Sequence, residues 1–218
     1  MDDVKKAFWK LKLESVRREL EANGFEAFVA ETMDDARTMV MDKIIPATES
    51  KSIAWGGSAT VKEGGLYEPL KDERFGLEVY DTFDRTIPRE EMAERRRRAL
   101  LVDLFVTGTN AVTEGGVLVN LDMIGNRVAA ITYGPRWVVI LVGRNKIVAD
   151  ISEAMNRIKD YTAPVNAMRL SFDTPCAKTG VCSDCSSPSR ICNSWTITEK
   201  SFPGGRIKVV LVNEDLGI

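Results

Sequence analysis

Apolar positions recur at helical spacing along the first twenty or so residues of the chain. This three-to-four-residue repeat predicts an amphipathic helix over residues 3–23, ending at Asn23-Gly24. Lysines, arginines and glutamates occupy the opposite side. The stripe expected to face the core consists of Val4, Phe8, Leu11, Ser15 and Leu20.

A second helix is expected to begin at Thr32, a residue type that commonly caps helix N-termini. It should end before Pro46, because proline cannot continue the hydrogen-bond pattern of a helix. Its buried stripe would be Ala36, Val40 and Ile44. Further helices are predicted at residues 58–64, from Pro88 onward, at 147–160 and at 164–170.

Short apolar runs bounded by turn residues separate these helices and predict strands. The predicted strands lie at residues 25–30, 52–55, 77–80, 103–107, 117–121, 128–132, 136–142, 195–199 and 207–212. Strands alternate with helices in the first half of the chain, and hairpin-like strands follow in the middle. This order predicts an α/β fold with a mixed, mainly parallel sheet and flanking helices, as one domain over residues 1–218.

Composition narrows the functional classes. The net charge of −2 gives no reason to expect nucleic acid or an anionic membrane as a partner. The longest apolar runs are far shorter than the ~20 residues of a membrane-spanning helix, and the charged N-terminal pattern predicts no signal peptide, so we expect a cytoplasmic protein. The sequence contains no histidine, which excludes Ser-His-Asp and Cys-His devices and imidazole-bound metals.

A glycine-rich loop follows the predicted strand 52–55. Its residues Gly56, Gly57, Ser58 and Thr60 could offer backbone and hydroxyl donors to a phosphate or carboxylate. An ordinary turn explains the same pattern equally well.

A second loop follows strand 103–107 and is richer in polar groups. Glu114 is the candidate acid/base or nucleophile, and Arg127 is the candidate clamp for an anion, because guanidinium groups bind carboxylates and phosphates through paired hydrogen bonds. Asn110, Asn120 and Asn126 could converge with them. The alternative is that Glu114 is a structural carboxylate paired with Arg127 or bonded to loop amides.

All four cysteines fall within seventeen residues, in a polar loop at about 173–193 with the spacing Cys176-x5-Cys182-x2-Cys185-x6-Cys192. Such a loop has little apolar mass to fold around, and clustered cysteines in a reducing compartment indicate a metal more often than disulfides. The single Cys-x2-Cys pair favours a [4Fe-4S] cluster over structural zinc, which usually shows two such pairs. Zinc and free or disulfide-bonded thiols remain alternatives.

Three motifs in order resemble the lactate-utilisation (LUD) domain family: TGTNAVTEGGVLVN at 107–120, Gly125-Asn126-Arg127, and VVILVGRNKIV at 138–148. The Gly56–Thr60 loop also fits that family's pattern, and the likeness runs from about residue 4 to 218. The resemblance implies the fold of sugar-phosphate isomerases and CoA transferases (NagB/RpiA/CoA transferase-like). Glutamates in comparable loops of that fold group can attack acyl-CoA, which is the analogy behind Glu114.

The implied role is organic-acid redox metabolism of the lactate type, with a small anionic ligand near the 56–60 and 110–114 loops. The cysteine spacing departs from ferredoxin-type runs and is closer to a cysteine-loop subgroup with a core like that of residues 178–185. A second hypothesis is a non-catalytic accessory subunit or ligand sensor, whose partner is an iron–sulfur oxidoreductase subunit and whose metal only orders the loop. The sequence leaves open whether the protein is an enzyme and whether it forms a homo-oligomer.

Overall fold

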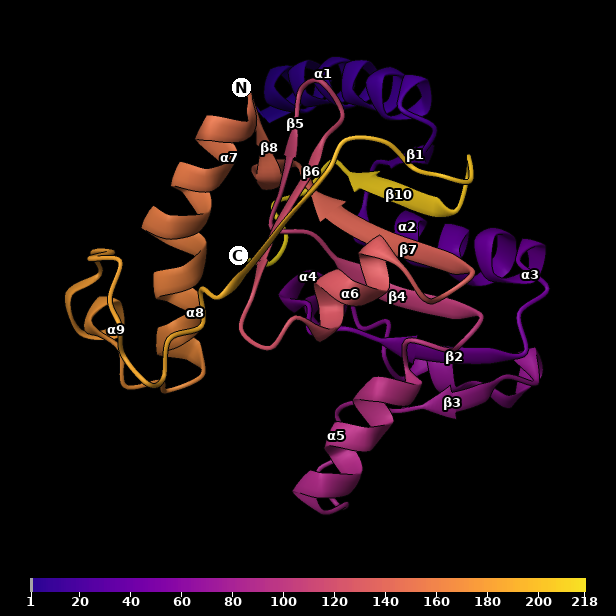
Figure 1. Ribbon diagram of the computed structural model, residues 1–218. Helices are drawn as coiled ribbons and strands as arrows, with labels where there is room; N and C mark the ends of the chain where they lie inside the picture. Colours follow the sequence, from indigo (N-terminus) through magenta and orange to yellow (C-terminus); the bar gives the residue numbers. More distant parts are fainter. Residues whose placement is uncertain (1) are drawn as a thin grey trace.

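The computed structural model describes residues 2–218 and contains two β-sheets with helices packed against them (Figure 1). The larger sheet has six strands, and every neighbouring pair is parallel. In spatial order the strands are β1 (Glu26–Ala30), β10 (Ile207–Val212), β7 (Trp137–Gly143), β4 (Leu104–Gly108), β2 (Ser52–Trp55) and β3 (Glu78–Tyr80). The α/β class with flanking helices is therefore confirmed.

The second sheet is small and mixed. Its order is β8 (Ile147–Val148), β5 (Ala111–Thr113), β6 (Leu118–Asp122) and β9 (Ser194–Thr198). Strands β5 and β6 form an antiparallel hairpin, β8 pairs parallel to β5, and β9 returns antiparallel to β6. The expected mixed sheet is thus two sheets, one wholly parallel and one mixed.

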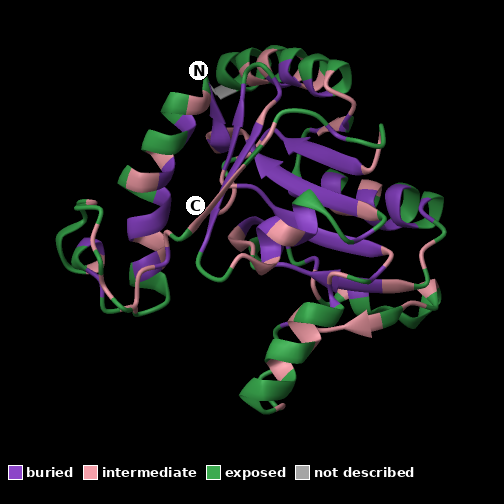
Figure 2. Ribbon diagram, in the orientation of Figure 1, coloured by how far each residue is buried: buried purple, intermediate pink, exposed green. Residues whose placement is uncertain are grey.

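The larger sheet is buried on both faces, as parallel sheets usually are. Alternate residues of β7 point to opposite sides: Val138 and Ile140 pack with α1 (Asp2–Ala22) and the second sheet, whereas Val139 and Leu141 pack with helices on the other face. Figure 2 shows the sheet strands buried and the outer helix surfaces exposed. The helices on the second face include α2 (Met33–Met39), α3 (Ile45–Ala47) and α4 (Ala59–Glu63).

Helix α1 forms as predicted, but the predicted stripe is wrong in its first half. Val4, Phe8 and Leu11 are exposed, whereas Leu13, Val16 and Leu20 enter the core with Trp9 packed beside them. The residues that face the core, at positions 9, 13, 16 and 20, follow one another in steps of three or four, as a helical face requires. The predicted stripe instead contains a five-residue step from Ser15 to Leu20, which breaks the repeat. The uninterrupted repeat is the one that faces the sheet.

Two helices continue where an interruption was predicted, one before Pro46 and the other between the predicted helices 147–160 and 164–170. Thr32 caps α2 with a reciprocal capping box to Asp35, but the helix then passes through a π-helical turn, Val40–Ile44, into α3, which contains Pro46. Likewise α7 (Ile151–Arg157) continues through a π turn, Ile158–Thr162, into α8 (Ala163–Arg169), which contains Pro164. Proline has no N–H to donate, and its ring clashes with the carbonyl one turn earlier. The wider π turn makes room for the ring, so the helix continues past it.

The predicted strand at 128–132 is wrong, because this segment belongs to helix α6 (Asn126–Thr132). Its β-branched residues suggested a strand, but the carboxylate of Asp122 accepts hydrogen bonds from the backbone N–H groups of Arg127 and Val128, both at 3.1 Å. A side chain from the preceding strand thus satisfies the first turn of the helix.

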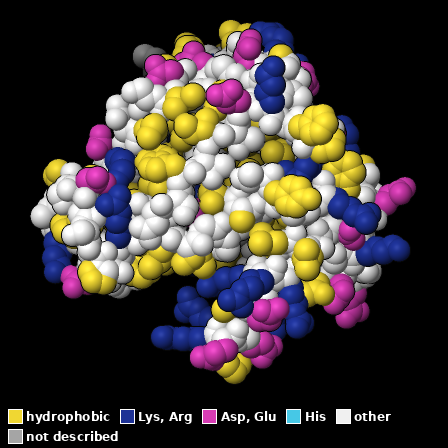
Figure 3. Space-filling model, viewed as in Figure 1, with side chains coloured by type: hydrophobic (Ala, Val, Ile, Leu, Met, Phe, Trp, Pro, Cys, Tyr) yellow, Lys and Arg dark blue, Asp and Glu magenta, His cyan; other side chains and the backbone are white. Residues whose placement is uncertain are grey.

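Helix α5 (Arg89–Arg98) has no buried residue and projects from the body of the molecule. Figure 3 shows dark blue Lys and Arg side chains gathered around this projection. Arg95, Arg97 and Arg98 each pair with a glutamate one turn earlier on the helix, so this is a solvated charged face.

The remaining short helices are 3₁₀ turns at Pro69–Lys71, Glu73–Phe75 and Arg144–Lys146, and α9 (Pro175–Thr179). None of the helices in residues 2–218 is both long and apolar enough to span a membrane.

Candidate functional site

The carboxyl ends of four adjacent strands meet at one edge of the large sheet. Strand β2 leads there into Gly56–Ser58, β4 into Thr109–Asn110, β7 into the turn Arg144–Lys146, and β10 into the segment 213–218. In open parallel sheets, ligands bind at this edge. The two loops singled out in the sequence therefore lie side by side, as expected.

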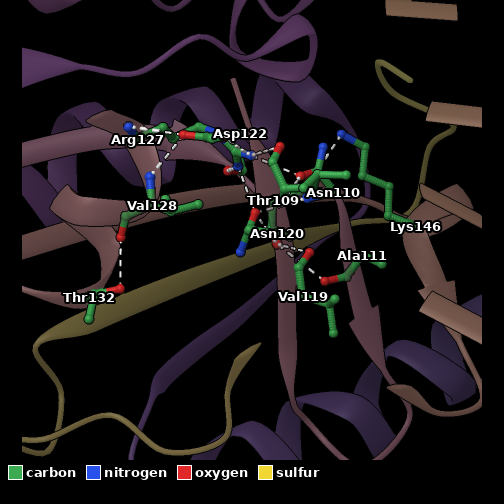
Figure 4. A network of polar contacts seen from close by, with 12 residues as sticks. Thr109, Asn110, Ala111, Val119, Asn120, Asp122, Arg127, Val128, Thr132 and Lys146 are labelled. Atoms are coloured by element: carbon green, nitrogen blue, oxygen red, sulfur yellow. Dashed lines mark hydrogen bonds and ion pairs between the residues drawn. The ribbon is translucent and has the colours of Figure 1, made fainter. Parts of the chain in front are cut away.

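Arg127 is the centre of a buried polar network at this edge (Figure 4). Its guanidinium forms a salt bridge to Asp122, with the Arg127 Nη2 to Asp122 Oδ1 distance at 2.6 Å. The other acceptors of the guanidinium are Asn120 Oδ1 at 2.6 Å, Asn110 Oδ1 at 2.8 Å, Gly108 O at 3.0 Å and Leu121 O at 3.3 Å.

Every N–H of this guanidinium thus has an acceptor from the protein itself. The charge is balanced by a carboxylate and the donors are filled, so Arg127 serves to fix α6 and the strand ends β4 and β6. The structure places Arg127 next to Asn110, as the sequence suggested, but leaves it no donor for an anion. Asn126 lies at the first position of α6, next to it in sequence.

The Gly56–Thr60 loop packs tightly rather than forming an open cradle. A Cβ on Gly56 would lie 2.9 Å from Thr107 Oγ1, and one on Gly108 would lie 2.4 Å from Ser58 Oγ, so both glycines are needed for this close approach. Ser58 Oγ accepts a hydrogen bond from Val61 N at the start of α4, and Ser58 N donates to the Tyr67 hydroxyl. Gly57 alone is exposed.

Lys146 lies between the two loops and was not singled out in the sequence. Its side chain is 4% exposed, and its Nζ donates to Thr60 Oγ1 at 2.7 Å and to Thr109 O at 3.3 Å (Figure 4). Burial lowers the pKa of this amine from 10.5 to about 7, and the positive charges of Arg157 and Arg127 add to the effect. Within residues 2–218, no carboxylate lies within salt-bridge distance of it.

Arg157 is a second basic residue at this edge, held by the turn 144–146, the Asn110 loop and Thr162. Its guanidinium donates to Asn145 O, Asn110 O and Thr162 Oγ1, at 3.2, 3.0 and 2.8 Å. Burial lowers its pKa too. Like Lys146, it hydrogen-bonds only to neutral partners in the described part of the chain, so neither basic group is directly paired with a carboxylate.

Two buried polar atoms near these residues have no hydrogen-bond partner among residues 2–218: Thr107 Oγ1 and Asn120 Nδ2. Buried polar groups are nearly always satisfied, and exceptions concentrate where a water or a ligand completes the site.

Glu114 lies at the other end of the β5–β6 hairpin. Its carboxylate pairs with Lys12 of α1 at 2.6 Å and is about half exposed, with 49% of the side chain accessible. The adjacent Gly116 allows the backbone of α1 to approach, because a Cβ there would lie 2.7 Å from Leu20 N. The hairpin turn next to Glu114 therefore packs against α1.

The four cysteine side chains line one small cavity of about 20 Å³, together with Lys159, Ser183, Asp184 and Arg190. Cys176 is buried at the start of α9, the other three are partly exposed, and no disulfide joins them. Burial is the main cause of a raised pKa at the Cys192 thiol, and the neighbouring Cys182 and Cys176 raise it further. Across residues 2–218, no three Cys, Asp or Glu groups are close enough together to hold a single metal ion.

The sequence profile of the family described as "LUD domain" matches residues 13–212. The chain belongs to the LUD domain family. Among solved structures, this LUD protein is similar to a DUF162 family protein from Deinococcus radiodurans, at 13% sequence identity and a TM-score of 0.47, with 95% of this chain and 97% of that chain covered. No curated protein matches the chain.

The predicted site residues thus separate into three groups in space. Thr60, Asn110 and Arg127 lie at the carboxyl edge, Glu114 lies beside α1, and the cysteines lie in α9 and the loop that follows it. Lys146 was missed because the sequence does not distinguish it from Arg144, which lies in the same turn between the apolar runs 138–142 and 147–148 but is only partly buried.

Proposed function

We propose that this LUD protein works in organic-acid redox metabolism, with a [4Fe-4S] cluster on Cys176, Cys182, Cys185 and Cys192. The observation that carries the proposal is that four thiols spread over seventeen residues line a single cavity. Thiolates are the ligands that iron–sulfur clusters use, and such a cluster would supply one-electron transfer.

The residues around the cavity fit a negatively charged thiolate centre. Lys159 and Arg190 line it, and their positive charges partly offset the burial that raises the pKa of Cys192, although both are also paired with Asp184. Arg190 also donates to the carbonyl oxygens of Cys185 and Cys192, which holds the loop closed around the thiols.

The sequence spacing, with its single Cys-x2-Cys pair, is the reason to prefer a cluster to zinc. The thiols line one cavity, but among residues 2–218 no three metal-binding groups converge on a single point. Binding of either metal would therefore have to draw the thiolates together.

The anionic ligand is proposed to bind at the carboxyl edge, with Arg157 in place of Arg127 as the cation and the Lys146 amine beside it as a hydrogen-bond donor. Lys146 faces the Thr60 loop, and Arg157 faces the Asn110 loop without a salt bridge among the described residues. A carboxylate or phosphate would balance the charge of Arg157 and supply hydrogen-bond acceptors.

The test is the metal content and the visible spectrum of protein purified without oxygen. About four irons per chain and a brown absorption band that bleaches on reduction are expected. Cys185→Ser should lose the band, and the neighbouring exposed Ser186→Ala should keep it. Protein with neither iron nor zinc would overturn the metal proposal.

One observation favours the second candidate, an accessory subunit with a structural zinc. The cavity of about 20 Å³ holds little more than one water-sized group. One zinc per chain and no visible band would establish this alternative, because zinc does not change its oxidation state.

A further inference from the structure

The hydrogen bonds of Lys146 match a neutral amine better than an ammonium ion. An ammonium carries three N–H donors, but the amine has only two acceptors, Thr60 Oγ1 and Thr109 O. Thr60 Oγ1 itself donates to Leu216 O, so it accepts from Lys146. A neutral amine would use both of its N–H groups here and keep one lone pair.

The charges around Lys146 also favour the neutral amine over the ammonium ion. Arg157 of α7 and Arg127 of α6 disfavour the ammonium form, and Glu63 of α4 opposes them only weakly. Glu63 also accepts a hydrogen bond from Gly217 N at 2.8 Å. With its pKa at about 7, a large fraction of the amine is unprotonated at neutral pH, which is the condition for a lysine nucleophile.

The segment 216–218 covers this amine. Leu216 N donates to Asn145 Oδ1 at 3.0 Å, and Gly217 packs so closely that a Cβ there would lie 2.8 Å from Thr60 N and 3.3 Å from Lys146 Nζ. Gly217 also has φ +64°, a conformation that favours glycine. Contacts of segment 216–218 therefore cover the amine, and the proposal below requires this segment to move aside.

We propose that Lys146 is a reactive amine that condenses with a small carbonyl compound carrying an anionic group. The amine lone pair forms the C–N bond to the carbonyl carbon. The two N–H hydrogens then leave with the carbonyl oxygen as water, and an imine results, without any oxidant or reductant. Arg157 would hold the anionic group, so this part of the proposal rests on the anion site proposed above.

The experiment uses the protein as purified, with glyoxylate as the probe and cyanoborohydride to trap the imine, followed by peptide mass spectrometry. Glyoxylate combines an aldehyde with a carboxylate. Exposed Lys62 of α4 is the internal reference. We expect Lys146 to be labelled at least about tenfold faster than Lys62 near pH 7.5, because a far larger fraction of it is unprotonated.

Two variants test the cover and the anion contact. Gly217→Ala should displace segment 216–218 and increase labelling of Lys146, while labelling of Lys62 stays unchanged. Arg157→Gln should slow the reaction with both aldehydes, because loss of this positive charge raises the pKa of Lys146, and should slow it more with glyoxylate than with acetaldehyde, which lacks the carboxylate. Lys146→Met removes the labelled peptide and serves as the assignment control.

The outcomes separate the proposals. Labelling of Lys146 no faster than Lys62, in both the wild-type protein and Gly217→Ala, would overturn the reactive amine. Rapid labelling with equal rates for glyoxylate and acetaldehyde would support the amine and overturn the anion contact. Iron content, measured on the same sample, tests the metal centre independently of both.

Discussion

Arg127 and Lys146 are two buried basic residues at the same sheet edge with opposite surroundings. Arg127 has Asp122 as a counter-charge and an acceptor for every N–H, whereas Lys146 has two neutral acceptors and other cations nearby. A buried charge that is fully paired fixes a structure, and one left without a partner shifts its pKa and becomes available for chemistry. The carboxylate, rather than burial itself, distinguishes the two roles.

The largest expected effect is the difference in stability between replacing Arg127 and replacing Lys146 by methionine. Arg127→Met leaves the Asp122 carboxylate buried without its partner, and we expect a loss of about 3–5 kcal/mol in the free energy of unfolding. Lys146→Met removes a poorly balanced group and should change stability by less than about 1.5 kcal/mol. Urea unfolding measures both. Equal losses would contradict the distinction.

The next effect is a pH dependence carried by Lys146 alone. Its pKa is about 7 in the folded protein and 10.5 in the unfolded chain, so the unfolded chain binds the extra proton between these values. Stability should therefore rise with pH above 7, by up to about 1.4 kcal/mol per pH unit from this group. The unfolding free energy of the wild-type protein minus that of Lys146→Met, followed from pH 7 to 9, isolates this contribution. A difference that does not change with pH would show that the amine is protonated normally.

A smaller effect is expected on anion binding. Arg157→Gln removes a cation from the edge and should weaken binding of glycolate, an unreactive hydroxy acid, by about tenfold in calorimetry. Arg206→Gln is the matched control. This arginine is also desolvated and bonded to backbone carbonyls of 130, 131 and 135, but it lies away from the loops. Equal weakening in both variants would indicate a general loss of structure.

The smallest effect is expected at Glu114. Its ion pair with Lys12 is partly exposed, and such pairs contribute about 0–1 kcal/mol. Glu114→Gln should therefore lower the melting temperature only slightly and leave labelling of Lys146 unchanged. A large loss of labelling would show that Glu114 contributes to the reactivity of Lys146. The unpaired surroundings of Lys146 would then not be enough to explain how it differs from Arg127.

The pattern of apolar residues was enough to predict the α/β class and the order of the larger elements, but not the short strands β5 and β8. It failed where a local contact overrides propensity: the β-branched segment 128–132 becomes helical because Asp122 satisfies its first turn. It also predicted a helix end before Pro46 and a break between residues 160 and 164, where π turns continue the helices instead.

For the site, the sequence indicated the two loops but not their partners. Glu114 and Asn110 are close in the chain, yet the hairpin places them at opposite ends, and only the strand pairing shows this. The sequence suggested that Arg127 binds an anion, but it did not show that the anion is the carboxylate of Asp122, five residues earlier. Lys146 was overlooked because its burial depends on α4, β4 and segment 216–218 together.

The continuous helix from α7 through its π turn has a thermodynamic consequence. Arg157 contacts the sheet-edge loops, and Lys159, two residues later, lines the cysteine cavity. If a ligand on one side repositions this turn and so alters the other side, linkage requires the two binding constants to change by the same factor. The ratio of glycolate affinities with and without metal would then equal the ratio of metal affinities with and without glycolate, so one titration measures the communication in both directions.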